Sequence, residues 1–167
     1  VVNAPAASSP YTASSDISNS TLSGGAKGIL VQGSQASANI HNNPSTITGA
    51  VIGVDVDGGS ATIYRNNITA NGTGVRVING GQVTSATENF IINNTSEGIR
   101  IETGTVTGAI NYNDLSGNTG LAINNLSAPM TAATCNWYGS FVPAIVAAEV
   151  SANVTYLPYL TTGTDEQ

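Results

Sequence analysis

The chain has 167 residues, of which only 8% are charged, and its net charge at pH 7 is −6. One domain is the usual prediction for this length. Its four basic residues are Lys27, Arg65, Arg76 and Arg100. Sequence-independent binding to nucleic acid requires many lysines and arginines clustered on one surface, so this composition argues against a nucleic-acid partner.

The sequence shows no membrane-spanning or export segment. No uninterrupted apolar run approaches the ~20 residues that a membrane helix needs, and the amino terminus lacks the basic and apolar regions of a signal peptide. The chain begins at Val1 without a methionine, which favours a piece of a longer polypeptide. Cys135 is the only cysteine, which excludes an intramolecular disulfide.

The main feature of the sequence is an internal repeat. In chain order the copies read KGILVQGS, IGVDVDGG, TGVRVING, EGIRIETG and TGLAINNL. The glycine shared by the copies serves as the register mark and falls at Gly28, Gly53, Gly74, Gly98 and Gly120, with spacings of 25, 21, 24 and 22 residues. Repeats of this length are typical of solenoids, in which each repeat forms one coil.

Each repeat reads as a set of short strands. Apolar residues alternate after the glycine, as at Val54 and Val56, and period two predicts a strand. A second apolar unit in each repeat has an asparagine two places before its apolar residue, at Asn66, Asn89 and Asn113. One asparagine per coil predicts a hydrogen-bonded column. The stretch around Pro44 lacks a matching asparagine, so we expect a loop to interrupt the column there.

A third run in each repeat is rich in β-branched residues, which completes about three strands per coil. The predicted fold is therefore all-β, a parallel β-helix of about five to six coils. We assign residues 1–15 to a leader or first-coil segment, 16–140 to the coils, and 141–167 to a carboxyl-terminal cap and terminal strand. A short capping helix is expected from Pro143, and we expect it to cover the open end of the solenoid together with Trp137.

The repeated units N-x-I and G-[VIL]-x-[VI] resemble those of right-handed parallel β-helix proteins of the pectate-lyase-like superfamily. The segments ATCNWYGS and VSANVTYLPYLTTGTD resemble the carboxyl-terminal end of β-helix domains in large secreted bacterial surface proteins. The resemblance covers about residues 16–165. It implies right-handed coils, an extracellular or cell-surface location, and a module without catalytic activity that acts as a spacer or in adhesion.

One sheet face carries the candidate site. The position two after each glycine mark points away from the core and holds Leu30, Asp55, Arg76, Arg100 and Ala122. Two residues further along the strand, the outward positions hold Gln32, Asp57, Ile78, Glu102 and Asn124. The candidate ligand-binding residues are those among these that carry charge: Asp55, Asp57, Arg76, Arg100 and Glu102. Because adjacent coils lie ~4.8 Å apart, Asp55 is predicted beside Arg76, and Arg76 beside Arg100, on an exposed face.

Three interpretations of this face remain open. Its charges pair across strands and keep the sheet soluble, or its arginines bind the carboxylates of a polysaccharide or cell-surface glycan. Alternatively, the superfamily resemblance implies a polysaccharide lyase or glycoside hydrolase, which in the lyase case uses a Ca2+ cluster and a general base. Asp55 and Asp57 lack further acids nearby, so we expect no metal site or other cofactor and favour a protein that is not an enzyme.

The remaining candidates are histidine and the aromatic residues. His41 is the only histidine, is expected in a solvated loop, and has no nucleophile motif around it. The aromatic residues gather toward the carboxyl end, at Trp137, Tyr138, Tyr156 and Tyr159. Packing of the terminal cap explains them better than a sugar-stacking platform.

Overall fold

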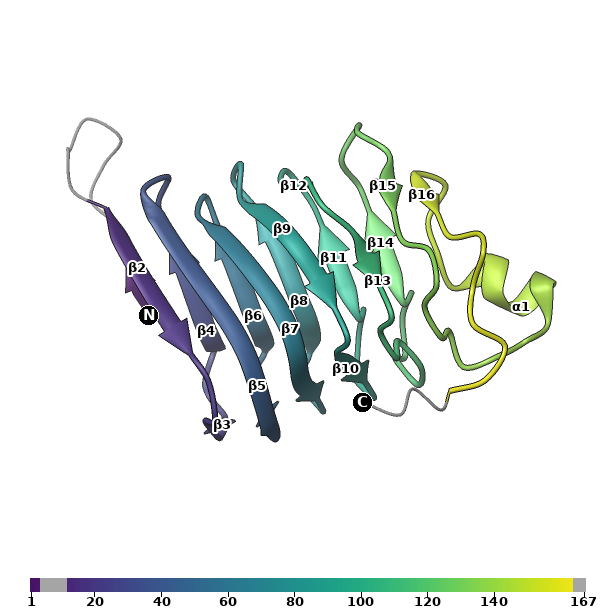
Figure 1. Ribbon diagram of the computed structural model, residues 1–167, viewed down its shortest axis with the longest axis horizontal. Coiled ribbons are helices and arrows are strands. Elements are labelled where there is room, and N and C mark those ends of the chain that lie inside the picture. The colour runs from purple at the N-terminus through teal and green to yellow at the C-terminus, as the bar shows by residue number, and fades with distance from the viewer. Residues whose placement is uncertain (4–11, 164–167) are drawn as a thin grey trace.

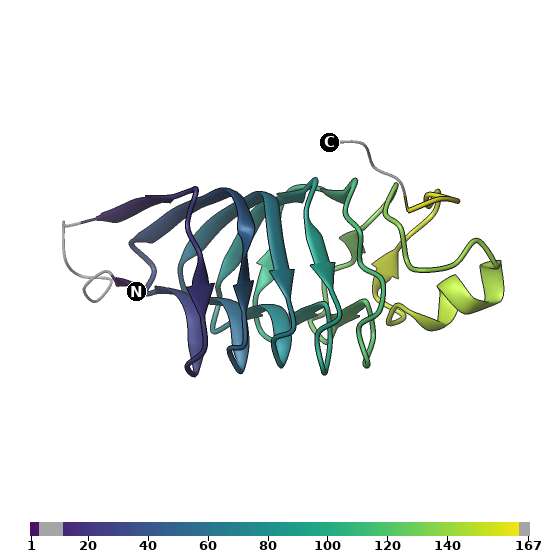
Figure 2. The same cartoon turned by 90° about the horizontal axis from the view of Figure 1, so that it is seen from below.

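The computed structural model describes residues 1–3 and 12–163 and has the fold predicted from the sequence. The chain winds into a solenoid of about six turns in which the strands stack in parallel along one axis (Figures 1 and 2). The first predicted segment lies partly outside these residues, as do the last four residues of the predicted cap. The helix found near the carboxyl end confirms the predicted capping helix.

Two parallel sheets, which we call sheet A and sheet B, form the main sides of each coil. Sheet B lies in front of sheet A in Figure 1. In spatial order, sheet A contains β1 (Val2–Asn3), β4 (Lys27–Gln32), β6 (Ile52–Asp57), β8 (Thr73–Ile78), β11 (Ile99–Ile101) and β14 (Ile123–Asn125). Sheet B contains β12 (Thr105–Val106), β9 (Gln82–Thr87), β7 (Ser60–Thr69), β5 (Ala36–Thr48) and β2 (Ala13–Ile17), with β3 (Leu22–Ser23), β10 (Phe90–Ile92) and β13 (Ile110–Asn111) paired alongside.

The long strands β5 and β7 bend partway along, so their second halves pair with β3 and β10 on a third side of the coil. The bend comes at Asn42 in β5 and at Arg65 in β7, whose φ angles are 49° and 54°. A single residue with a left-handed backbone conformation interrupts the extended strand and turns it through a corner. We call this corner, between sheet B and the third side, the B corner.

A ladder of buried asparagines lies inside the B corner and confirms the predicted column. Asn66 Nδ2 donates to Asn89 Oδ1 at 3.0 Å, and Asn89 Nδ2 donates to Asn113 Oδ1 at 2.9 Å. The column extends by one residue at each end, because Asn43 donates to Asn66 and Asn113 donates to Asn136. The prediction of an interruption at Pro44 is wrong: the pairing between β5 and β7 shifts between Asn43 and Ile47, which keeps Asn43 in the ladder.

A second ladder was missed by the sequence interpretation. Asn71 donates to Asn94 Oδ1 at 3.3 Å, and Asn94 donates to Asn118 Oδ1 at 2.9 Å. Each member directly follows a left-handed residue, Ala70, Asn93 or Gly117, as at the B corner. The two ladders give buried polar groups hydrogen-bond partners in the next coil, which is the condition for burying them without a large cost.

The core inside the coils consists of stacked isoleucines and valines. At the start of the third side, a fully buried column runs through Ile47, Ile68, Ile91 and Leu115. Tyr138 ends this column, with 3% of its surface exposed and its hydroxyl donating to the carbonyl of Ala133 at 2.8 Å. An apolar side chain of each coil therefore packs on its counterpart in the next, and burial of this surface stabilises the stack.

The glycine mark of the repeat is a point of close approach between coils. A Cβ atom on Gly74 would lie 2.6 Å from the carbonyl oxygen of Gly98, and one on Gly53 would lie 2.7 Å from that of Gly74. The register also corrects the last copy. Ile99 pairs with Ile123, so the residue equivalent to Gly98 is Ala122 rather than Gly120. Gly120 is exposed and lies near Ser96 instead.

We expect Gly74→Ala to destabilise the protein by about 2–3 kcal/mol, because the added methyl group clashes with backbone and with the Ile91 side chain. Gly120→Ala is the matched control, since a Cβ there meets its nearest atom at 3.2 Å, and it should cost less than about 1 kcal/mol. Urea unfolding followed by circular dichroism measures both. Equal losses would show that close approach does not explain the glycine mark.

The carboxyl-terminal end is closed by helix α1 (Pro143–Ala148) and by the paired strands β15 (Thr131–Ala132) and β16 (Val154–Thr155). The helix lies beyond the last coil (Figure 2), and its Val146 is fully buried in the core. The expectation that Trp137 covers the open end is wrong. Trp137 alternates with the inward residues Asn136 and Tyr138, so its partly exposed ring lies outside the coil near Gly163.

Candidate functional site

Asp55 lies at the centre of the predicted site, but it does not face solvent. Its carboxylate is fully buried, because Arg76 and Lys27 from the two neighbouring coils close over it. Arg76 donates from Nε to Oδ1 and from Nη2 to Oδ2, both at 2.9 Å, and Lys27 Nζ forms an ion pair with Oδ2. The predicted register of Asp55 beside Arg76 is confirmed, and the predicted exposure of Asp55 is wrong.

These contacts set the charge state of both groups. Burial acts to raise the pKa of the Asp55 carboxyl, but the hydrogen bonds from Arg76 and Lys27 outweigh it and hold the pKa below its ordinary value of 3.8. The hydrogen bonds to Asp55 likewise raise the pKa of Arg76 above its ordinary value. At neutral pH this cluster therefore consists of one carboxylate held between two cations.

Arg100 pairs with acids of its own coil rather than with Asp55. Its Nη1 donates to Glu97 at 2.8 Å and its Nε donates to Glu102 at 2.9 Å. Arg76 and Arg100 are direct neighbours across β8 and β11. Like charges side by side are destabilising, so the separate carboxylates that each arginine holds explain how the pair is tolerated.

Glu97 is almost buried and has a full set of partners. One carboxylate oxygen accepts from Arg100 and from Asn124 Nδ2 at 3.1 Å, and the other accepts from the Ser96 hydroxyl at 2.7 Å. Burial acts to raise the pKa of Glu97, but the hydrogen bonds from Ser96 and Asn124 prevail and lower the pKa to about 2.

The sequence interpretation missed Lys27 and Glu97, although each directly precedes a glycine mark. Successive side chains of a strand point to opposite faces, so a residue directly before the glycine mark is expected on the opposite face from the residue three places later. Lys27 and Glu97 are therefore expected on the opposite face from the one that holds Asp55 and Arg100. Both side chains nevertheless reach the outward carboxylate or guanidinium of the charged cluster. A charge immediately before the repeated glycine is the signal that could have identified them.

Asp57 stands apart from the arginines. Its carboxylate accepts from Asn79 at 2.8 Å and from Gln32 at 3.2 Å, both amide side chains of neighbouring coils. The corrected register also changes the far end of the column, where Arg100 lies beside Asn124 instead of Ala122. Of the five predicted residues, the structure thus pairs Asp55 with Arg76 and Arg100 with Glu102, and leaves Asp57 outside.

A shallow hollow of about 400 Å³ lies over this part of sheet A. We call it the sheet A hollow. The side chains that line it include Thr73, Arg76, Glu97, Arg100 and Glu102. The side chains of Arg76 and Arg100 are 24% and 34% exposed, so part of each guanidinium surface remains open to a ligand.

The charged residues do not form a calcium site. Among residues 1–3 and 12–163, no three side chains of the histidine, cysteine, aspartate and glutamate type come together as ligands. Asp55, the best-placed acid, already holds two cationic side chains. Calcium takes six to eight oxygen ligands, so this donor set does not fit the ion.

Over residues 1–3 and 12–163, no helix has the length and apolar character to cross a membrane.

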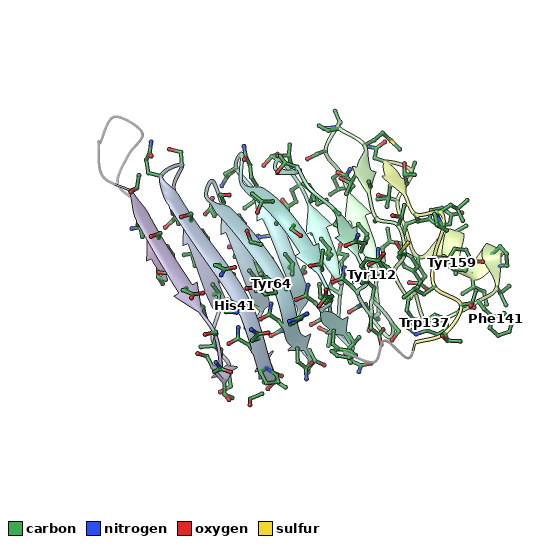
Figure 3. All side chains as sticks on the ribbon, viewed as in Figure 1. His41, Tyr64, Tyr112, Trp137, Phe141 and Tyr159 are labelled. Atoms are coloured by element: carbon green, nitrogen blue, oxygen red, sulfur yellow. The ribbon has the colours of Figure 1, made fainter. Side chains whose placement is uncertain are left out.

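His41 lies in β5 rather than in the predicted loop. Its Nε2 contacts Asp16 at 2.6 Å, and its ring stacks on Tyr64 of the next coil with centroids 4.9 Å apart (Figure 3). The tyrosines near the carboxyl end pack as predicted, with centroids of 6.5 Å for Tyr138 and Tyr156 and 6.4 Å for Tyr156 and Tyr159. These aromatic residues join coils and complete the cap.

In a comparison with known protein families, residues 10–155 match a family described as the right-handed β-helix region. The match spans most of the chain and agrees with the parallel pairing of every sheet. Separate comparisons with curated proteins and with solved structures found no match.

Proposed function

Because the chain belongs to the right-handed β-helix family, we propose that it is a non-catalytic module and acts as a rigid spacer in an extracellular or cell-surface adhesion protein. In this proposal a polysaccharide or cell-surface glycan contacts the sheet A hollow through the exposed parts of Arg76, Arg100 and Glu102. The resemblance of the carboxyl-terminal segment to secreted bacterial surface proteins supports the location.

The observation that carries the proposal is the internal pairing of the charged side chains. Asp55 is enclosed by Arg76 and Lys27, and Arg100 joins Glu97 to Glu102. The bonds of Asp55 to Lys27 and Arg76 link three successive coils of sheet A and, with the two asparagine ladders, stiffen the solenoid along its axis. A solenoid whose coils are cross-linked in this way suits a rigid spacer.

A lyase or glycoside hydrolase is the alternative, and its chemistry requires different charge states. A general base must have a pKa near the working pH, whereas the pKa of Arg76 is raised by its bonds to Asp55. A glycosidase acid must have a raised pKa, whereas the pKa of Glu97 is lowered to about 2. The pKa shifts of Arg76 and Glu97 therefore favour ion pairing within the sheet A hollow over proton transfer to a substrate.

Incubation with uronate-rich and neutral polysaccharides, with and without calcium, tests the proposal. Bound fraction and new unsaturated or reducing ends are followed together. We expect no new ends under any condition, and binding, where it occurs, should weaken when Arg76 and Arg100 are both replaced by alanine. New ends that disappear in Arg100→Ala would establish catalysis and overturn the proposal.

A further inference from the structure

A second hollow, of about 480 Å³, lies outside the B corner, on the amino-terminal half of the solenoid. We call it the corner hollow, and its size is within the range of small-ligand sites. Sheet A does not border this corner, so the hollow is separate from the sheet A hollow. It is lined by Asn19, Asn42, Pro44, Arg65, Asn66 and Phe90.

The corner backbone presents one side chain per coil to this hollow. Asn19, Asn42 and Arg65 occupy the same corner position in successive coils, with φ angles of 48°, 49° and 54°. Because the corner repeats with the coil, the three polar side chains form a row with steps of ~4.8 Å. The row is parallel to the solenoid axis, which suits an extended ligand.

Three side chains of the corner hollow, those of Asn19, Asn42 and Arg65, keep polar atoms that form no internal hydrogen bond within the described residues. Arg65 donates from Nε to Glu88 at 2.6 Å, and within residues 1–3 and 12–163 its Nη1 and Nη2 form no hydrogen bond. The same holds for the side chain of Asn19 and for Oδ1 of Asn42 in that part of the chain. Donors and acceptors without internal partners are open to a ligand.

Arg65 is also the most accessible basic group. Its side chain is 57% exposed, compared with 29% for Lys27, 24% for Arg76 and 34% for Arg100. Glu88 orients the guanidinium through Nε and leaves the two outer nitrogens as a fork that matches one carboxylate. On a chain of net charge −6, this residue is the best-placed attraction for an acidic group.

The rest of the lining is apolar and comes from Pro44 and Phe90. Phe90 belongs to β10 and pairs in register with Asn67, which places it one coil beyond the corner of β7. An aromatic ring beside amide groups and a guanidinium provides an apolar surface and polar groups within one small site.

We propose that the corner hollow binds an acidic oligosaccharide, with Arg65 on a sugar carboxylate, Asn19 and Asn42 on hydroxyl groups, and Phe90 against the apolar face of a sugar ring. This site is additional to the sheet A hollow and does not depend on ligand binding there. It makes the B corner a recognition surface of the module.

The test titrates the 167-residue chain with oligogalacturonate and with the same oligosaccharide methyl-esterified on its carboxylates, by isothermal calorimetry. Arg65→Gln should weaken binding of the free acid about tenfold or more, the loss of one charge-assisted hydrogen-bonded pair. Phe90→Leu, which keeps an apolar side chain but removes the ring, should also weaken it. Gln82→Ala, at an exposed residue of β9 that lines neither hollow, is the control and should bind within about twofold of the unaltered protein. Arg100→Gln is titrated alongside to show whether the sheet A hollow holds the glycan instead.

Three outcomes would overturn the inference. They are binding of the esterified and free oligosaccharides with equal affinity, no binding of either, and loss of binding in Arg100→Gln but not in Arg65→Gln. The last outcome would place the glycan in the sheet A hollow and so support the proposed function while refuting this site. Circular dichroism melting of each variant separates lost binding from lost folding.

Discussion

Replacing Asn89 by alanine should lower the free energy of unfolding by about 4 kcal/mol and the melting temperature by about 10 °C. Asn89 is 1% exposed and is the middle member of the first ladder. Its Oδ1 accepts from both the backbone N–H and the Nδ2 of Asn66, each at 3.0 Å. Its Nδ2 donates to the carbonyls of Ile63 and Thr87 and to Asn113 Oδ1.

The expected loss is large because alanine leaves these partners buried. The backbone N–H of Asn66 and the carbonyl of Ile63 lose bonds that water cannot replace, and each unsatisfied buried group costs about 1–3 kcal/mol. Chemical denaturation and thermal melting followed by circular dichroism measure the effect.

Asn67→Ala is the control, since Asn67 is the same residue type in the adjacent coil but points away from the core. Its Oδ1 is buried but has no hydrogen-bond partner within the described residues, so its removal leaves no donor unpaired. We expect this variant to stay within about 0.5 kcal/mol of the unaltered protein. If the two substitutions cost the same, the ladder does not contribute specifically to stability.

The fold could be predicted because its determinants recur in every coil. Alternating valines and isoleucines, a glycine at the point of close approach and an asparagine after most left-handed corners repeat at the coil length. The errors occur where one coil departs from that pattern. At the last coil Ala122 takes the place of a glycine, and after Asn43 the shift in pairing hides the asparagine from a fixed spacing.

The charged cluster could be predicted only in part. Strand register placed Asp55 beside Arg76 and Arg76 beside Arg100, because register follows from the repeat. The burial of Asp55 depends on the conformation of Lys27, a long side chain whose reach across a coil does not follow from period two. The corner hollow was missed because its row of side chains follows the left-handed positions, which have no common residue type in the sequence.

Asp55→Asn should lower the free energy of unfolding at pH 7 by about 3 kcal/mol, and this loss should shrink as the pH falls below 3.8. The substitution keeps the size of the side chain but leaves Lys27 and Arg76 without their counter-charge, and breaking a buried ion pair in this way is strongly destabilising. Because the side chains of Lys27 and Arg76 remain 29% and 24% exposed, we expect a loss of stability toward the lower end of the range for broken buried ion pairs, about 3–5 kcal/mol.

The sign of the pH dependence follows from the direction of the pKa shift. The folded-state pKa of Asp55 lies below the ordinary 3.8, so its contribution is fully present above that pH and is lost as the pH falls through the folded-state pKa. The difference between Asp55→Asn and the unaltered protein should therefore narrow from pH 5 toward pH 2. Glu97, whose pKa falls from 4.5 to about 2, contributes in the same direction in both proteins.

Urea unfolding at pH 7, 5, 3 and 2 measures this difference, and Asp57→Asn provides the control. Asp57 lies two residues further along the same strand, but its partners are the neutral amides of Gln32 and Asn79, so its replacement leaves no cation unpaired. We expect it to cost less than about 1 kcal/mol at every pH. A constant cost of Asp55→Asn across this range would mean that packing around Asp55, rather than its charge, links β4, β6 and β8.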